Sequence, residues 1–486
     1  MKNKILLPVF LILILTIRCG SDTDSTDLYN DLDLSYNSGN FDELGLLTDS
    51  IRKNYPDSIL LIRKTDSLLE LSERVIIDFP YSSNEIKSDI ERRLSRSITD
   101  DEIAAWENRG WLEYRYINGE KRYFDRAASN LMLLRMFYED RKARSAAQSN
   151  DPNMLFRLKH TEQVINAAGN KVDPVLPVDM IITFTLTVAP DVVPDGEMIR
   201  CWLPWPKGNH IRQKPPELIH TSNPDYIIAS DTVVHRSVYM EETAVKGSPV
   251  IFMVKYRYQS SARYFNPETI KNVPYDKTSY TYIKYTSEQL PQIHFSDNVR
   301  RLADSIAGPQ DDPVTAVRKI YLWFKANIPW TGALEYSIMP DIPEYVIKNR
   351  RGDCGMQTLL FISMLRYKGI PARWQSGWMV PPGDEGLHDW CEVFFEGTGW
   401  VPVDISYNLQ DSGDKKLREF YISGIDSYRM IINDGISGKF YPEKKYMRSD
   451  FYDFQRGEVE WKGGNIYYDK WDYDMEIEYL KRSGNE

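Results

Sequence analysis

One cysteine stands where a helix is predicted to begin, and this position suits a nucleophile. Cys354 follows Arg-Gly-Asp, and the apolar or small residues after it share one helical face: Met356, Leu359, Leu360, Ser363 and Met364. Gly369 and Pro371 are typical of a helix end, so the pattern predicts a helix over about 354–368. Unpaired N–H groups in its first turn favour an anion, which lowers the pKa of a thiol and can bind an oxyanion. We therefore expect Cys354 to ionise near neutral pH and to react rapidly with iodoacetamide.

A thiolate nucleophile needs a base and a group that orients the base, and the sequence offers few candidates. Only six histidines occur in the 486 residues. His388 opens a predicted strand, HDWCEVFF, and Asp404 lies 16 positions later in a second strand, WVPVDIS. An even separation places two residues on the same face of a hairpin, here with its centre at Glu396. Asp404 is thus expected to hold the imidazole of His388 while the other ring nitrogen faces Cys354.

Other polar and thiol groups near these strands are expected to have lesser roles. Asp384 falls in a Pro-Pro-Gly-Asp loop, and Asp389 is expected on the strand face opposite His388. Cys391 has the opposite parity to His388, so it is expected to be a buried small hydrophobe. Cys201 lies on a predicted strand and is also expected to pack. No Cys/His spacing resembles a zinc site and no Asp-rich loop resembles an EF-hand, so we expect neither a metal nor another cofactor.

Two segments resemble the core of the transglutaminase-like superfamily: GDCGMQTLLFISMLRYKGIPARWQSGW and HDWCEVFFEGTGWVPVD. The resemblance spans about residues 310–410 and implies a papain-like fold with a Cys-His-Asp triad. It implies that Cys354 is the nucleophile, His388 the base and Asp404 the orienting group. Aromatic donors stabilise the oxyanion in some relatives, so Trp330 is the candidate for a second donor beside the Cys354 N–H. A packed core tryptophan is the alternative at that position.

The first 19 residues, MKNKILLPVFLILILTIRC, are typical of an exported protein. Two lysines precede an apolar run that is too short to span a membrane comfortably. The run resembles a bacterial lipoprotein signal, which implies cleavage before Cys19 and lipidation of Cys19; an uncleaved membrane anchor is the alternative. Residues 20–30 form a polar tether whose Ser-Asp-Thr-Asp resembles the acidic tag of surface lipoproteins. We expect a cell-envelope protein, lipid-anchored to the outer membrane and exposed at the surface.

Hydrophobic patterning divides the rest of the chain into four regions. Residues 31–165 are mostly helical, with one hairpin around an Asn-Gly turn, and residues 172–268 alternate in polarity, which predicts a β-sandwich. Residues 285–430 place helices before strands. Residues 431–486 are rich in aromatics and predict a β extension; a sugar- or peptide-binding aromatic face is the alternative. The expected fold class is multidomain α+β, with a papain-like transglutaminase core preceded by the helical region and the sandwich.

The negative net charge and the predicted export signal limit the functions that we expect for this protein. Sixty Lys and Arg against 70 Asp and Glu give a net charge of −10, so no nucleic-acid partner is expected. The function we favour is thiol-dependent acyl transfer on amides of extracellular proteins or peptides, ending in hydrolysis. One alternative is transfer to an amine, as in protein-glutamine crosslinking. The other is a non-catalytic surface module that binds through the aromatic tail.

Overall fold

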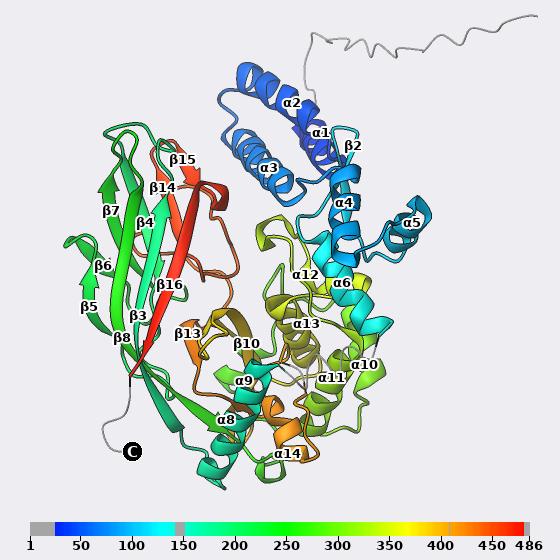
Figure 1. Cartoon of the computed structure of the whole chain (residues 1–486), viewed down its shortest axis with the longest axis vertical. Helices are drawn as coiled ribbons and strands as arrows, with labels where there is room; N and C mark the ends of the chain where they lie inside the picture. The colour runs from blue at the N-terminus through cyan, green and yellow to red at the C-terminus, as the bar shows by residue number, and fades with distance from the viewer. Residues whose placement is uncertain (1–24, 141–150, 408, 481–486) are drawn as a thin grey trace, which may run out of the picture. The chain divides into compact units, whose positions relative to one another are not determined.

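The computed structural model describes residues 25–140, 151–407 and 409–480, and the chain divides into two compact units (Figure 1). The first unit comprises the residues up to Glu73 together with Tyr116–Glu120, and the second comprises the remainder. The expected signal peptide and Cys19 lie outside the described residues. Within the described part of the chain, no helix has the length and apolar character needed to cross a bilayer.

The first unit is helical. It contains α1 (Ser25–Ser38), α2 (Phe41–Asn54) and most of α3 (Ile59–Asp78). The turn between α1 and α2 requires a glycine, because Gly39 has φ +76° and a Cβ there would lie 2.0 Å from the Tyr116 carbonyl oxygen. The Asn118 N–H, from a distant turn of the same unit, donates to the Gly39 carbonyl at 2.8 Å.

The second unit begins with further helices, and several of the turns and helix starts in this region have the residues that such positions favour. Asn118 and Gly119, at the turn between β1 and β2, both have positive φ, as an Asn-Gly hairpin turn requires. Two helix starts carry capping boxes, formed by Ser82 with Glu85 and by Thr99 with Glu102. The elements are α4 (Ser83–Leu94), α5 (Asp100–Asn108), β1 (Tyr114–Ile117), β2 (Glu120–Tyr123), α6 (Ala127–Tyr138) and α8 (Pro152–Ala168).

Two five-stranded sheets form a sandwich around one apolar core (Figure 1). In β3 from Met180 onward, and along the whole of β8, every second side chain is buried, which is the period of a strand with one face on a core. One sheet has the order β12-β8-β3-β16 with β5 beside β8, and the other has the order β15-β14-β4-β7-β6. The strands of the first sheet are β3 (Val175–Val188), β5 (Glu217–Thr221), β8 (Val250–Tyr264), β12 (Gly424–Ile425) and β16 (Trp471–Tyr479). Those of the second are β4 (Met198–Pro204), β6 (Tyr226–Ile228), β7 (Ser237–Thr243), β14 (Glu458–Trp461) and β15 (Gly464–Ile466).

The aromatic tail completes this sandwich instead of extending beyond it. β14 pairs with β4 and β16 pairs with β3, so the tail contributes to both sheets. Trp471 is buried in the shared core, whereas Tyr473 is 38% exposed. The tail is therefore part of the sandwich that the sequence placed only at 172–268.

Beside the sandwich, the second unit contains a four-stranded antiparallel sheet of order β11-β10-β9-β13, with a cluster of helices packed on it. α13 packs on one face of this sheet and is buried over almost its whole length. The elements are α9 (Tyr280–Tyr285), α10 (Asp297–Ile306), α11 (Pro313–Asn327), α12 (Ile342–Asn349), α13 (Cys354–Tyr367), β9 (Ala372–Met379), β10 (Gly386–Phe395), β11 (Gly399–Val403), α14 (Lys415–Arg418) and β13 (Arg429–Asn433). Helices and several sheets in one chain give the multidomain α+β class.

Candidate active site

Cys354 is the first residue of α13 and lines a cavity. The helix runs from Cys354 to Tyr367, close to the predicted range, and the Asp353 side chain caps it by accepting from the Met356 N–H at 2.9 Å. The cavity has a volume of about 240 Å³. Its polar lining comes from the start of α13, β10, the turn before α12, the residue before α6 and the segment 441–457. It includes Cys354, Tyr336, Asp353, Asp389, Asp450 and Asp453.

The sulfur of Cys354 has an acidic partner that sequence reasoning placed elsewhere. The thiol donates to Asp389 Oδ2 across 3.2 Å. Gln455 Nε2 donates to Asp389 Oδ1 at 2.8 Å, so both carboxylate oxygens are occupied. Asp389 was expected to face away from the nucleophile, and the structure shows the opposite.

His388 and Asp404 form the expected pair. His388 Nε2 lies 2.7 Å from Asp404 Oδ2, and both side chains are buried. The β10–β11 register pairs Phe395 with Gly399, which centres the hairpin on Gly397, one residue later than the predicted Glu396. Asp404 therefore lies diagonally from His388 and not directly opposite it, but still on the same face.

Alternation along β10 separates this pair from the sulfur. Leu387 and Asp389 line the cavity, whereas His388 is not among the lining residues and stacks with Trp390 on its own face. Within the described residues, no hydrogen bond joins Cys354 to His388. The expected contact between the second ring nitrogen and the thiol is thus not formed, because the side chain that follows His388 occupies the place next to the sulfur.

Charges around each group set its protonation. Burial raises the pKa of Asp404, but His388 and Arg429 outweigh burial and hold that pKa well below its usual range. Burial lowers the pKa of His388, so the imidazole is neutral at neutral pH. Burial, Asp389 and Asp353 all raise the pKa of Cys354. The direction of this shift is opposite to the low thiol pKa expected from the helix N-terminus, because burial and two carboxyl groups disfavour the thiolate.

Burial and neighbouring carboxyl groups raise the pKa values of the other acids of the cavity. Burial raises the pKa of Asp353 to about 6, and burial with the neighbouring Asp453 raises that of Asp450 to about 7. Burial, Asp453 and Asp353 also raise the pKa of Asp389. No group of three or more His, Cys, Asp or Glu side chains among the described residues is arranged to hold a metal ion.

Aromatic side chains cover the start of α13. Trp330 is 46% exposed and lines the cavity, so it is not the packed core residue considered as its alternative. Its role as an oxyanion donor stays a prediction. Tyr336 donates to Asp353 Oδ1 at 2.6 Å, and a Cβ on Gly355 would lie 2.1 Å from the Tyr336 hydroxyl. The phenol thus packs directly on the first turn of α13, and only glycine fits beneath it.

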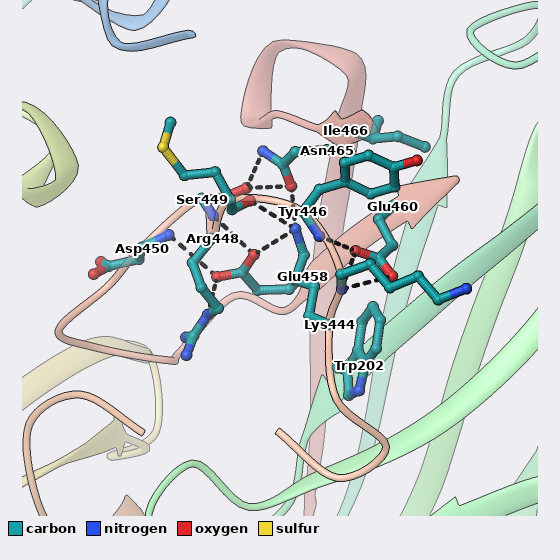
Figure 2. Close-up of polar contacts among 12 residues, drawn as sticks. Trp202, Lys444, Tyr446, Arg448, Ser449, Asp450, Glu458, Glu460, Asn465 and Ile466 are labelled. Carbon is teal, nitrogen blue, oxygen red and sulfur yellow. Dashed lines mark hydrogen bonds and ion pairs between the residues drawn. The ribbon is translucent and has the colours of Figure 1, made fainter. Parts of the chain in front are cut away.

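The segment 441–457 brings four polar cavity residues from far along the chain, and buried carboxylates hold it in place (Figure 2). Glu458, 1% exposed, accepts from Arg448 Nε at 2.7 Å and from the Ser449 and Asp450 N–H groups at 2.8 and 3.1 Å. Glu460 accepts from two further N–H groups of the segment. These contacts fix the backbone at Asp450. No local sequence pattern points to this contribution, which sequence reasoning missed.

Comparisons with known proteins agree with the sequence resemblance. Residues 300–405 match the family model of the transglutaminase-like superfamily, and no curated protein matches the chain. A candidate cysteine protease from Cytophaga hutchinsonii is 14% identical with a TM-score of 0.44, covering 64% of this chain and 93% of its own. The periplasmic domain of TgpA from Pseudomonas aeruginosa is 17% identical with a TM-score of 0.23, covering 51% and 91%. The family match and the cavity-lining cysteine support a cysteine enzyme. The matched residues 300–405 contain Cys354, which is the first residue of their buried helix.

Proposed function

We propose that the protein catalyses acyl transfer on amide bonds of proteins or peptides through a thioester at Cys354. The observation that carries the proposal is the position of this thiol, at a helix N-terminus and on the wall of a cavity of about 240 Å³. The sulfur attacks the carbonyl carbon, and the oxyanion that forms accepts from the N–H groups of the first turn. Ammonia or an amine leaves with a proton, and a thioester remains.

We assign the base to His388 and its orientation to Asp404. A neutral imidazole can accept the thiol proton, and a carboxylate 2.7 Å from Nε2 stabilises the imidazolium that results. Transfer of this proton requires the sulfur to leave Asp389 and meet the ring. Because the ring and the sulfur lie on opposite faces of β10, the assignment includes a local rearrangement of that strand, and not of side chains alone, at the start of the reaction.

We favour water as the acceptor that resolves the thioester. A polar cavity of this volume accommodates several waters beside the sulfur, at about 30 Å³ each. One feature favours the alternative, transfer to an amine: carboxyl groups of Asp353, Asp389 and Asp450 line the cavity and would attract a protonated amine such as a lysine side chain. The two outcomes share every residue assigned above.

A peptide library distinguishes these outcomes. We expect the wild-type protein to release ammonia or cleaved peptide, and to incorporate little of an added labelled primary amine, with both signals absent in Cys354→Ala. Mass spectrometry of the library reads deamidation, cleavage and amine incorporation together. Amine incorporation without hydrolysis would favour crosslinking. Binding of peptides without either product would favour the non-catalytic module.

We further propose that lipidation of Cys19 anchors the protein in the outer membrane, where its substrate is an extracellular protein or peptide. A lipidated cysteine that follows a short apolar run provides the anchor. Cys19→Ser is expected to move the protein from the membrane fraction to the soluble fraction, as measured by fractionation and immunoblotting, while Cys201→Ala leaves it in the membrane. Retention of Cys19→Ser in the membrane would instead indicate an uncleaved apolar anchor.

A further inference from the structure

Neighbouring groups on and beside β10 hold Asp389 in position for its hydrogen bond with Cys354. Asp389 is 2% exposed, and its Oδ2 lies 3.2 Å from the sulfur. Gln455 Nε2 donates both to Asp389 Oδ1, at 2.8 Å, and to the His388 carbonyl, at 3.0 Å. One amide thus ties the carboxylate to the backbone of its own strand. The Asp389 carboxylate is therefore fixed beside the sulfur.

Every element around the sulfur contributes charged or titratable groups, and carboxyl groups predominate. Asp353 and Arg126 are the residues just before α13 and α6. Glu335 and Tyr336 come from the turn before α12, and Tyr468 from the turn before β16. The segment 441–457 contributes Asp450, Asp453 and Arg456. Arg456 and Glu335 form an ion pair with two hydrogen bonds, which largely cancels their charges. Arg126 is the other cation of the lining, against four aspartates. The surroundings therefore oppose a further negative charge.

We propose that Asp389 is a positioning residue that holds Cys354 as a protonated thiol in the resting site, so that the nucleophile ionises only when this hydrogen bond is broken. The consequence for catalysis rests on the proposed function, but the state of the thiol does not. Ionisation of the sulfur beside Oδ2 would place two anions about 3 Å apart in a partly desolvated cavity, where repulsion is stronger than in water. The directions of the pKa values of Cys354 and Asp389 agree with this reasoning.

The test is the pH profile of Cys354 alkylation by iodoacetamide, followed by peptide mass spectrometry on the full chain. Asp389→Asn keeps the shape of the side chain and removes its charge. We expect the midpoint pH of alkylation to fall by at least about 1 unit, which is about tenfold faster reaction on the rising limb of the profile. An unchanged or raised midpoint in a folded Asp389→Asn protein would overturn the proposal.

Two controls distinguish the effect of the Asp389 hydrogen bond on alkylation from the electrostatic effect of any carboxyl group in the cavity and from an effect of unfolding. Asp450→Asn removes a carboxyl group from the same cavity but no contact with the sulfur, so we expect a smaller shift; an equal shift would overturn the specific role of Asp389. Cys201 and Cys391 are fully buried and report folding, because they react only when the protein opens. If Asp389→Asn exposes them, Asp389→Ala takes its place.

The wild-type protein provides an independent measurement. We expect its Cys354 to alkylate with a midpoint above that of glutathione under the same conditions, and a midpoint below it would overturn the proposal. Failure of the proposed function would look different: no Cys354-dependent product would form from the peptide library, while the shift in Asp389→Asn would persist.

Discussion

Cys354→Ala is expected to reduce the release of ammonia or amine from a substrate of this protein by at least about 10³-fold. The reason is that no other described thiol is able to take its place. Cys201 and Cys391 have no exposed surface, and Cys391 donates to the Val403 carbonyl on the adjacent strand. Single-turnover kinetics with a peptide selected from the library, with detection of the acyl-enzyme by mass, measures the effect.

Cys391→Ala is the matched control for this variant. It removes a sulfur from the same sheet, at a position that packs beneath α13 and does not line the cavity. We expect it to cost about 1–2 kcal/mol in free energy of unfolding and to leave the rate of product formation within about threefold. Equal activity of wild type and Cys354→Ala would exclude thioester chemistry at this site.

The largest effect on stability is expected from Arg429→Met. Arg429 is fully buried, and its Nη2 lies 3.1 Å from Asp404 and 3.2 Å from Asp426. Removal of the guanidinium leaves two buried carboxylates without their cation. Loss of one member of such a network costs about 3–5 kcal/mol, and urea unfolding of the variant measures it.

Arg318→Met is the matched control, because its guanidinium makes two hydrogen bonds to Glu419 near the surface, where the Arg318 side chain is 41% exposed. We expect it to cost less than about 1 kcal/mol. If both substitutions cost the same amount, the buried network has no special contribution to stability.

The same network predicts a pH dependence. Although burial raises the pKa values of Asp404 and Asp426, neighbouring cations lower both below the values of unfolded carboxyls. Groups of this kind stabilise the fold above their unfolded pKa, and the contribution disappears as the pH falls through the folded pKa. The stability difference between wild type and Arg429→Met should therefore be largest near neutral pH and narrow below about pH 4.

Local features of the fold were predictable from the sequence. The glycine and proline after α13 and the Asn-Gly turn fix the backbone over a few residues, so short stretches contain the needed information. The pairing of His388 with Asp404 was also predictable, because a shift of the hairpin centre by one residue changes the sum of paired positions by two and keeps parity. The correct pair thus followed from a register that was off by one residue.

The sequence did not predict which face of β10 packs against α13 and therefore which side chains lie beside the sulfur. Strand alternation establishes that His388 and Asp389 face opposite sides, but it does not reveal which side receives α13. That choice depends on the packing of Cys391 and Val393 against the helix, a contact between distant segments. The raised pKa of Cys354 has the same origin, because the burial and charges that produce it come partly from Asp389, 35 positions further along the chain.

The segment 441–457 also limits how the region matched by the family model can be isolated. The family match ends at residue 405, yet Asp450, Asp453 and Gln455 complete the wall of the cavity and are held by a strand that begins at Glu458. That strand pairs with β4, a strand from much earlier in the second unit. A fragment that contains only the matched residues 300–405 would keep Cys354 but lose the part of the cavity wall that the segment 441–457 provides. The sandwich thus supports one wall of a cavity whose cysteine belongs to the neighbouring helix and sheet.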